Sequence, residues 1–283
     1  MRIIDGMAVQ VIIGIIILFA VIALVLWIIE LGDRSRIQTK WRSLEVKPGG
    51  RIFSPEMIED LPEPAKRYLL HSIEPGTPLP GHVVFFMKGE FLTSPTAKPM
   101  PMTASQILSV PKGLIWKAWM GSGLMKIAGY DYYSDGKGGQ KFNLWGLIPF
   151  LKSSGDDITR SAAGRVGGEA FLMPSSLLPS GTVTWESIDR NSAKAIIAVG
   201  NERVEVTMTF DENGALRKVA LPRWSNVNPE KEFRYMPFEG TGFSDEKNFG
   251  GITIPTRFQA GWHPEDGDFA PFFFAVIEIM EYR

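Results

Sequence analysis

One long apolar run opens the hydrophobic pattern of the chain. Between positions 8 and 29 only Gln10 and Gly14 interrupt the apolar side chains. An α-helix of that length rises by about 33 Å, which is enough to cross the hydrocarbon core of a bilayer. The pattern therefore predicts a transmembrane anchor over residues 1–30. The side chains expected to meet lipid or the membrane interface are Ala8, Ile15, Phe19, Leu24 and Trp27.

A cleaved signal peptide is the alternative interpretation of the same run. Signal peptides have a shorter apolar region, and a small-residue A-x-A-like cleavage site follows it. This run is longer than that, and no such site comes after it. The sequence therefore favours a permanent anchor.

Residues 31–53 are more polar and end in the turn-forming sequence KPGG. They predict a basic juxtamembrane linker that is helical up to Leu44. Basic side chains gather on this flank of the apolar run, whereas Arg2 stands alone on the other. The positive-inside rule then predicts a single-pass protein of the inner (cytoplasmic) membrane whose remaining chain lies in the cytoplasm. The basic residues that decide this orientation are Arg34, Arg36, Lys40 and Arg42.

Helix signals are few after the linker. Ser54 and Pro55 suit an N-cap and a first helical position. A second short helix, restarted by prolines, turns Tyr68, Leu69 and Ile73 toward the core. A third and weaker helix is predicted over 157–172, where alanines are diluted by several glycines.

From position 81 the hydrophobic pattern changes to a period of two. Val204, Val206, Met208 and Phe210 alternate with polar residues, which predicts a strand with one buried face. Glycine pairs and an Asp-Gly turn predict a hairpin over 130–144. Further strands are predicted at 81–92, 113–120, 232–243, 251–262 and 272–282, with four over 183–221.

These elements predict a mainly β fold class. We expect one N-terminal transmembrane helix, followed by a large curved antiparallel sheet of half-barrel type with two or three short helices. The sheet would hold nine to eleven strands. The predicted organisation is an anchor (1–30), a linker (31–53) and a β-rich soluble domain (54–283).

Five segments also carry a family resemblance. They are LPEPAKRYL, MPMTASQILSVPKGLIWKAWM, DGKGGQKFNLWGLIP, GGEAFLMPSSLLPSGTVTWESID and GGITIPT, and the likeness runs from about position 61 to 282. In order and spacing they resemble an uncharacterised bacterial family of membrane-anchored proteins, known as a domain of unknown function. No activity or catalytic residue can be carried over from it. The strand-rich pattern is similar to the half-barrel of bacterial lipoprotein carriers, which implies a curved sheet over an apolar cavity, by fold analogy only.

Composition and charge remove several classes of function. The formal net charge is -1 and the pI is about 6.4, so bulk charge gives no reason to expect a nucleic-acid partner. The chain contains no cysteine, which excludes disulfides, thiolate catalysis and cysteine-ligated metals.

Candidate catalytic groups are scarce. There are three histidines and no Gly-x-Ser-x-Gly elbow. Ser134 and Lys137 have a Ser-x-x-Lys spacing, but they lie in the predicted hairpin turn. The acidic loop with His263, Glu265, Asp266 and Asp268 lacks the spacing of a calcium loop and is expected to be solvated. We therefore expect no enzymatic activity, no metal and no other cofactor.

The stretch KFNLWGLIPFLK, residues 141–152, is unusually apolar between its lysines. Its alternation breaks at Leu144, so it is not one half-buried strand throughout. Two interpretations stay open: an apolar loop that plugs the end of the sheet, or an exposed loop that docks on a bilayer or a membrane partner. The candidate docking residues are Trp145, Leu147, Ile148, Phe150 and Leu151.

Aromatic residues are spread over the predicted sheet, and most are expected in its core. A subset is a candidate lining for an apolar cavity, the kind of site that lipophilic ligands need. The candidates are Trp116, Tyr132 and Trp185.

Two functional hypotheses follow. The first is a non-enzymatic accessory or assembly subunit of a larger membrane protein complex, with the bilayer and other integral membrane subunits as partners. The second is a membrane-tethered binder or carrier of a lipid or another hydrophobic ligand. A filled sheet interior would favour the first, and a large cavity with aromatic walls would favour the second.

Overall fold

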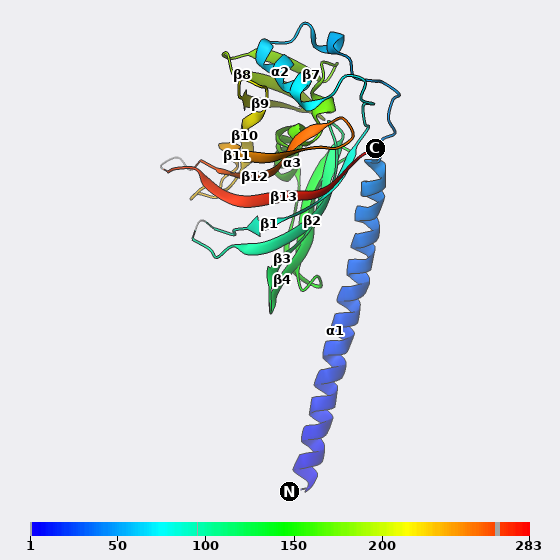
Figure 1. Cartoon of the computed structure of the whole chain (residues 1–283). Helices are drawn as coiled ribbons and strands as arrows, with labels where there is room; N and C mark the ends of the chain where they lie inside the picture. Colours follow the sequence, from blue (N-terminus) through cyan, green and yellow to red (C-terminus); the bar gives the residue numbers. More distant parts are fainter. Residues whose placement is uncertain (1, 95, 264–266) are drawn as a thin grey trace.

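A long helix and one large sheet make up the protein (Figure 1). The computed structural model describes residues 2–94, 96–263 and 267–283. Helix α1 (Arg2–Ser43) is continuous over 42 residues. Its apolar part stands clear of the sheet, and it is long and apolar enough to cross a membrane, with a mean hydropathy of 3.4.

The sheet has 13 strands, and every pairing in it is antiparallel. Its order is β6-β5-β4-β3-β2-β1-β13-β12-β11-β10-β9-β8-β7. The strands are β1 (Val83–Phe91), β2 (Met100–Ser109), β3 (Gly113–Ser122), β4 (Met125–Ser134), β5 (Lys137–Leu144), β6 (Ile148–Ser154), β7 (Val183–Ser187), β8 (Ser192–Val199), β9 (Glu202–Phe210), β10 (Leu216–Ser225), β11 (Arg234–Asn248), β12 (Thr253–Trp262) and β13 (Ala270–Tyr282).

The sheet consists of two meanders that meet where the first strand pairs with the last. Strands β1 to β6 run consecutively to one edge, and β13 back to β7 run to the other. The junction is the β1–β13 ladder, in which Phe85 lies opposite Met280 and Gly89 opposite Ala275. Gly89 is required there, because a Cβ at this position would meet the carbonyl oxygen of Phe274 at 1.7 Å.

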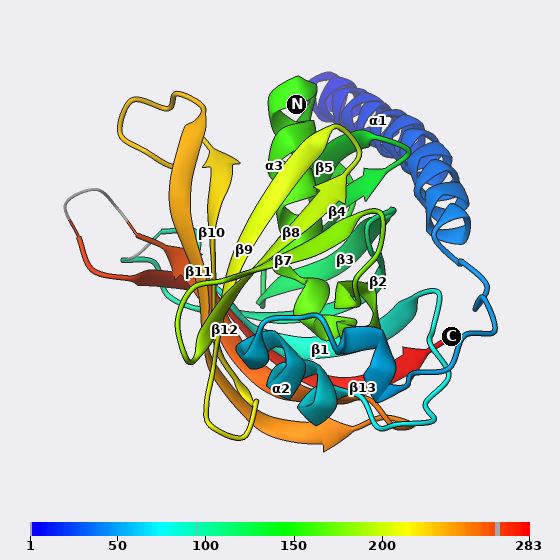
Figure 2. The same ribbon diagram turned by 90° about the horizontal axis from the view of Figure 1, so that it is seen from above.

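The sheet curls around helix α3 (Asp156–Gly168), which connects β6 to β7 (Figure 2). Short helices η2 (Ala170–Leu172) and η3 (Pro174–Leu177) continue α3, and η1 (Pro55–Ile58) precedes α2 (Glu63–Ser72). Helix α2 buries Tyr68 and Leu69 against the sheet, and the Tyr68 ring stacks on Phe210 with centroids 4.8 Å apart. Helix α3 therefore covers the concave face from inside the curl, and α2 covers the sheet beside α3.

The last part of α1 packs on the convex face of the sheet, outside the curl (Figure 2). Ile37, and Leu44 directly after the helix, are buried there against Ile107 of β2 and Ile115 of β3. Lys117 of β3 adds a cation–π contact, with its ammonium 4.6 Å from the Trp41 ring. The helical part of the predicted linker thus continues the apolar helix without a break and attaches it to the domain.

The mainly β fold with a curled antiparallel sheet is confirmed, as are the three predicted helical regions. The predicted strand number was too low, because β2 and β6 were not recognised as strands. β2 follows Pro99 directly and contains Pro101, and it buries side chains on both faces of the sheet, so its pattern is not a simple alternation. β6 is an edge strand without a buried side chain, so it shows no alternation either.

Candidate functional site

A cavity of about 570 Å³ lies between the concave face of the sheet and α3. In the first meander it begins where β1 and β3 end and β2 and β4 start, for example at Phe91, Met100, Met120 and Ile127. In the second meander it begins where β10 and β12 end and β11 and β13 start. In an antiparallel meander these positions share one end of the sheet. The β3–β4 and β5–β6 turns are at that same end.

The walls of the cavity are mainly apolar, and 12 of the 38 described residues that line it are aromatic. Trp116 lies in the centre of one wall, with its ring centroid 6.2 Å from that of Phe142 and 6.1 Å from that of Phe273. A second group brings Phe171 into edge-to-face contact with Phe243 and Phe258. Trp262, Phe238 and Phe272 form a third group near the strand ends. Such walls suit a ligand with apolar surface and few polar groups.

A charged cluster interrupts this apolar lining. Arg165 of α3 lies 2.9 Å from Asp131 of β4 and 2.6 Å from Glu169, and the amide of Gln106 donates to Glu169. The Arg165 guanidinium also lies over the Trp116 ring, 5.2 Å from its centroid. Burial raises the pKa of Asp131, and the positive charge of Arg165 only partly opposes that rise. These groups pair with one another, although Oδ1 of Asp131 is buried without a hydrogen-bond partner among the described residues. They show no arrangement of nucleophile and base.

A second arginine of the lining, Arg223 on β10, has different surroundings. Its guanidinium lies 5.0 Å from the centroid of Phe238 and 5.6 Å from that of Trp262. Its Nε donates a 3.4 Å hydrogen bond to the carbonyl oxygen of Ser161. Burial, followed by repulsion from Arg165, lowers the pKa of Arg223 to about 10. Sequence reasoning missed both arginines of the cavity.

Of the three predicted lining residues, the structure brings only Trp116 to the cavity. Tyr132 points to the convex face, where Lys40 of α1 lies 5.0 Å from its ring centroid. Trp185 packs at the edge of the core, and its Nε1 donates to the carbonyl oxygen of Leu177 at 2.9 Å. On β4 it is Asp131, the neighbour of Tyr132, that lines the cavity.

The candidate docking residues form a turn followed by the edge strand β6, and not one loop as expected. Trp145, Ile148, Phe150 and Leu151 are exposed, and Leu147 is half-buried. Their stretch therefore does not plug the sheet from inside. Phe150 and Leu151 nevertheless reach the rim of the cavity.

The β3–β4 turn extends this exposed apolar surface. The indole Nε1 of Trp145 donates to the carbonyl oxygen of Leu124 at 2.7 Å, which joins the two turns. Leu124 is 90% exposed. We call this surface the apolar tip; it consists of Trp119, Leu124, Met125, Trp145, Ile148 and Phe150, all of them exposed.

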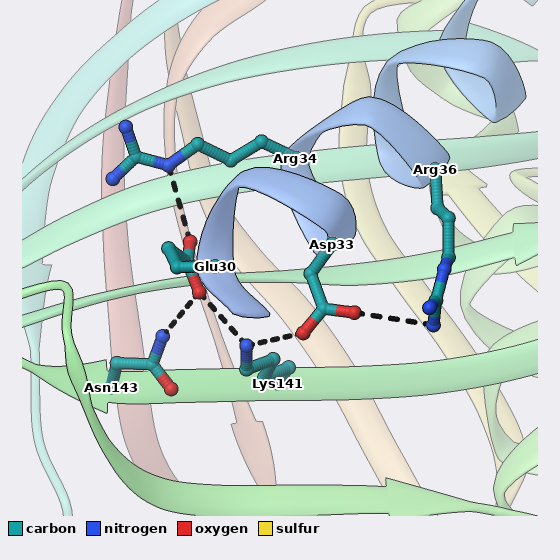
Figure 3. Close-up of polar contacts among 6 residues, drawn as sticks. All are labelled: Glu30, Asp33, Arg34, Arg36, Lys141 and Asn143. Atoms are coloured by element: carbon teal, nitrogen blue, oxygen red, sulfur yellow. Dashed lines mark hydrogen bonds and ion pairs between the residues drawn. The ribbon is translucent and has the colours of Figure 1, made fainter. Parts of the chain in front are cut away.

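A polar clasp joins the end of β5, next to the apolar tip, to α1 (Figure 3). Lys141 of β5 lies 2.8 Å from Glu30 and 2.5 Å from Asp33, and the Asn143 side chain donates to Glu30 at 2.7 Å. Burial alone would lower the pKa of Lys141, but its bonds to Asp33 and Glu30 outweigh burial and the pKa is raised. Glu30 follows directly on the apolar run, and β3 and β4 extend along α1 toward its N-terminus (Figure 1).

The described residues hold no group of three or more His, Asp or Glu side chains that could bind a metal ion. Glu265 and Asp266 of the acidic loop lie outside the described residues. His263 pairs with Glu239 at 2.9 Å. Ser134 donates to Asp135 within the β4–β5 turn at 2.8 Å.

Comparisons with known proteins concern family and fold. The model of "Family of unknown function (DUF6544)" matches residues 51–275. No curated protein matches the chain. The predicted resemblance to a domain of unknown function is therefore confirmed.

Three solved structures illustrate the similarity in fold. A LolA superfamily protein from Nitrosomonas europaea is 10% identical with a TM-score of 0.42, and the match covers 78% of this chain and 92% of that one. A putative outer membrane lipoprotein-sorting protein domain from Vibrio parahaemolyticus is 10% identical, with a TM-score of 0.39 and coverage of 72% and 86%. A DUF1329 family protein from Desulfovibrio piger is 8% identical, with a TM-score of 0.38 and the same coverage.

Proposed function

The chain belongs to the DUF6544 family, and we propose that it is a non-enzymatic, membrane-tethered binder or carrier of a lipid or another hydrophobic molecule. The cavity carries this proposal. Its volume of about 570 Å³ lies within the range of about 300–1,000 Å³ that is usual for small-molecule sites. Sequence reasoning placed the assembly role first, and the hollow sheet interior reverses that order.

The cavity can supply reversible binding. A hydrocarbon ligand that buries about 300–400 Å² of apolar surface gains roughly 8–10 kcal/mol. Association itself costs at least about 4 kcal/mol. The difference, at most about 4–6 kcal/mol, corresponds to dissociation constants from tens of micromolar to millimolar, which suits a protein that takes up and releases its ligand.

The attachment of α1 supports a permanent anchor. Glu30 and Asp33 are bound to Lys141, and Ile37 and Leu44 are part of a buried cluster with the sheet. Removal of the helix as a signal sequence would break contacts that belong to the folded domain. We therefore assign residues 8–29 to the bilayer, with the domain on the cytoplasmic side by the positive-inside rule.

The apolar tip supports direct contact between the domain and the same bilayer. The clasp holds the tip at the level where the apolar run of α1 ends. Each large apolar side chain that is fully buried in lipid gains about 1.5–3 kcal/mol. Lys126 and Lys152 are exposed beside the tip and suit anionic lipid heads. Because Phe150 belongs to both the tip and the cavity rim, a lipid can pass from one to the other along protein surface.

Filling the cavity tests the proposal. Ser161→Phe places a ring in the cavity from α3, and Thr184→Phe adds the same ring on the exposed face of β7 as the matched control. Full-length protein would be purified from its native membranes in mild detergent, and its bound lipids would be measured by native mass spectrometry. We expect lipid on the wild type and on Thr184→Phe, and a several-fold loss on Ser161→Phe. Equal lipid on all three would refute the cavity as the binding site.

The edge strand β6 favours a second candidate function, the accessory or assembly subunit. β6 ends the sheet, so its outer side offers unpaired backbone groups together with exposed Ile148 and Phe150. Such an edge can accept a strand from another integral membrane subunit. A stoichiometric companion in the same purification would support this function, and a lone monomer would contradict it.

A further inference from the structure

Arg223 adds to the cavity lining a positive charge that no ion pair with another described residue compensates. The residue lies on β10, where Val219 and Leu221 turn inward before it with a period of two, and it follows them onto the concave face. The rings of Phe238 and Trp262 hold its guanidinium by cation–π contacts. This support fixes the side chain without neutralising it.

Arg165 provides the comparison within the same cavity. Its guanidinium is paired with both Asp131 and Glu169. Arg223 forms no ion pair within the part of the chain that the structure describes, and its one hydrogen bond there joins Nε to the neutral carbonyl of Ser161. The lowered pKa of Arg223 agrees with this contrast, because Asp131 and Glu169 attract its charge too weakly to offset burial and Arg165.

Arg223 lies two residues before the end of β10, at the end of the sheet where exposed lining residues such as Val227 mark the cavity mouth. Ser225 and Asn226, at the end of β10, and Thr93, after β1, are polar residues of the same lining. The aromatic groups around Trp116 and Phe171 lie farther along the strands. A ligand with one polar end and one apolar end therefore matches the cavity in one orientation, with the polar end at the mouth.

We propose that Arg223 binds the anionic head group of an amphiphile whose hydrocarbon part fills the aromatic cavity. A guanidinium offers paired N–H donors that match the two oxygens of a carboxylate or a phosphate. The head group is thus a fatty-acid carboxylate or a lipid phosphate. This inference rests on the proposed function, since it requires that the cavity binds an amphiphile.

A charge-specific competition assay tests the inference. Full-length protein in neutral detergent at pH 8 is loaded with N-phenyl-1-naphthylamine, an uncharged fluorescent probe of apolar cavities. The competitors are hexadecanoate, 1-palmitoyl lysophosphatidic acid and hexadecanol, which differ chiefly in their head groups. We expect the wild type to prefer at least one of the anions to the alcohol by about 10-fold or more, and the preferred anion identifies the head group.

Variants assign that preference to the residue. Arg223→Gln should lose the preference and still bind hexadecanol, while Arg223→Lys should keep part of it. Arg217→Gln, on the same strand but exposed and paired with Asp211, is the matched control and should behave as the wild type. An unchanged preference in Arg223→Gln overturns the role of Arg223, as does a wild type that binds all three competitors equally. A wild type that binds neither probe nor competitor overturns the proposed function itself.

Discussion

The carboxylate of Glu30 lies 2.8 Å from the ammonium of Lys141, and this pair joins the end of the apolar helix to strand β5. Both side chains are nearly buried, at 13% and 8% exposure. Asp33 shares the same ammonium from one helical turn further on. The pair fixes the position of the domain relative to the apolar part of α1, and thereby the position of the apolar tip and the cavity mouth.

We expect Lys141→Met to release α1 from the sheet without unfolding the sheet. The substitution leaves two carboxylates in a nearly buried place without a cation, and breaking a buried ion pair costs about 3 kcal/mol or more. Hydrogen exchange should then become about 100-fold faster for the amides of residues 30–44, and remain unchanged in β8 and β9.

Lys88→Met is the control for this experiment. Lys88 pairs with Glu278 on the sheet, but both side chains are exposed, at 57% and 38%. Such a surface pair contributes little, so the control should exchange as the wild type does. If the amides of residues 30–44 exchange as slowly in Lys141→Met as in the wild type, the apolar contacts of Ile37 and Leu44 are sufficient to hold the helix.

We expect the apolar tip to lie in the lipid interface when the protein is reconstituted in bilayers. The chain has no cysteine, so Leu124→Cys gives one unique labelling site. An environment-sensitive fluorophore there should be quenched by brominated lipids and protected from an aqueous quencher. Trp145→Ser with Phe150→Ser should weaken both effects, because the tip loses two of its large apolar side chains.

Ile188→Cys provides the reference position for the tip. It is 48% exposed and directly follows β7, which contacts α2 and forms the edge of the sheet opposite β6. Its label should respond to the aqueous quencher only. If the label at position 124 behaves in the same way, the tip is not in the membrane, and a protein partner becomes the better explanation of its exposure.

The alternation of apolar residues was sufficient to predict most of the sheet. Val204, Val206, Met208 and Phe210 are all buried in β9, as expected for a strand with one wet face. The pattern failed for β2, which buries side chains on both faces, and for β6, which buries none. Ile107 of β2 is buried on the convex side because α1 packs there, and the sequence of β2 alone does not predict this contact.

The candidate site was harder to predict, because residue type was a poorer guide than register. Tyr132 was chosen as an aromatic residue, yet Asp131 occupies the inward position next to it. Extending the inward series Val219 and Leu221 by two residues would have found Arg223. Its ring partners lie on β11 and β12, however, and only the folded sheet brings them to β10.

We expect Arg165→Met to destabilise the domain strongly. The substitution leaves Asp131 and Glu169 without their shared cation at the floor of the cavity. The expected loss in the free energy of unfolding is about 3–5 kcal/mol, as for other buried pairs that lose one partner. Urea unfolding followed by tryptophan fluorescence measures it. Arg203→Met, at a residue that is 65% exposed, should change it by less than about 1 kcal/mol.

The pH dependence of the free energy of unfolding should separate the contribution of Asp131 from that of the other carboxylates. Because burial raises the pKa of Asp131, the folded state binds this proton more tightly than the unfolded chain does. The resulting stabilisation is fully present below the unfolded pKa of about 3.9 and is lost as the pH rises through the folded pKa.

Asp131→Asn carries no titrating proton and still leaves Glu169 to pair with Arg165. Unfolding measured in steps from pH 4 to pH 7 should therefore show a smaller fall in stability for Asp131→Asn than for the wild type. Parallel curves for the two proteins would mean that Arg165 keeps the pKa of Asp131 near its ordinary value.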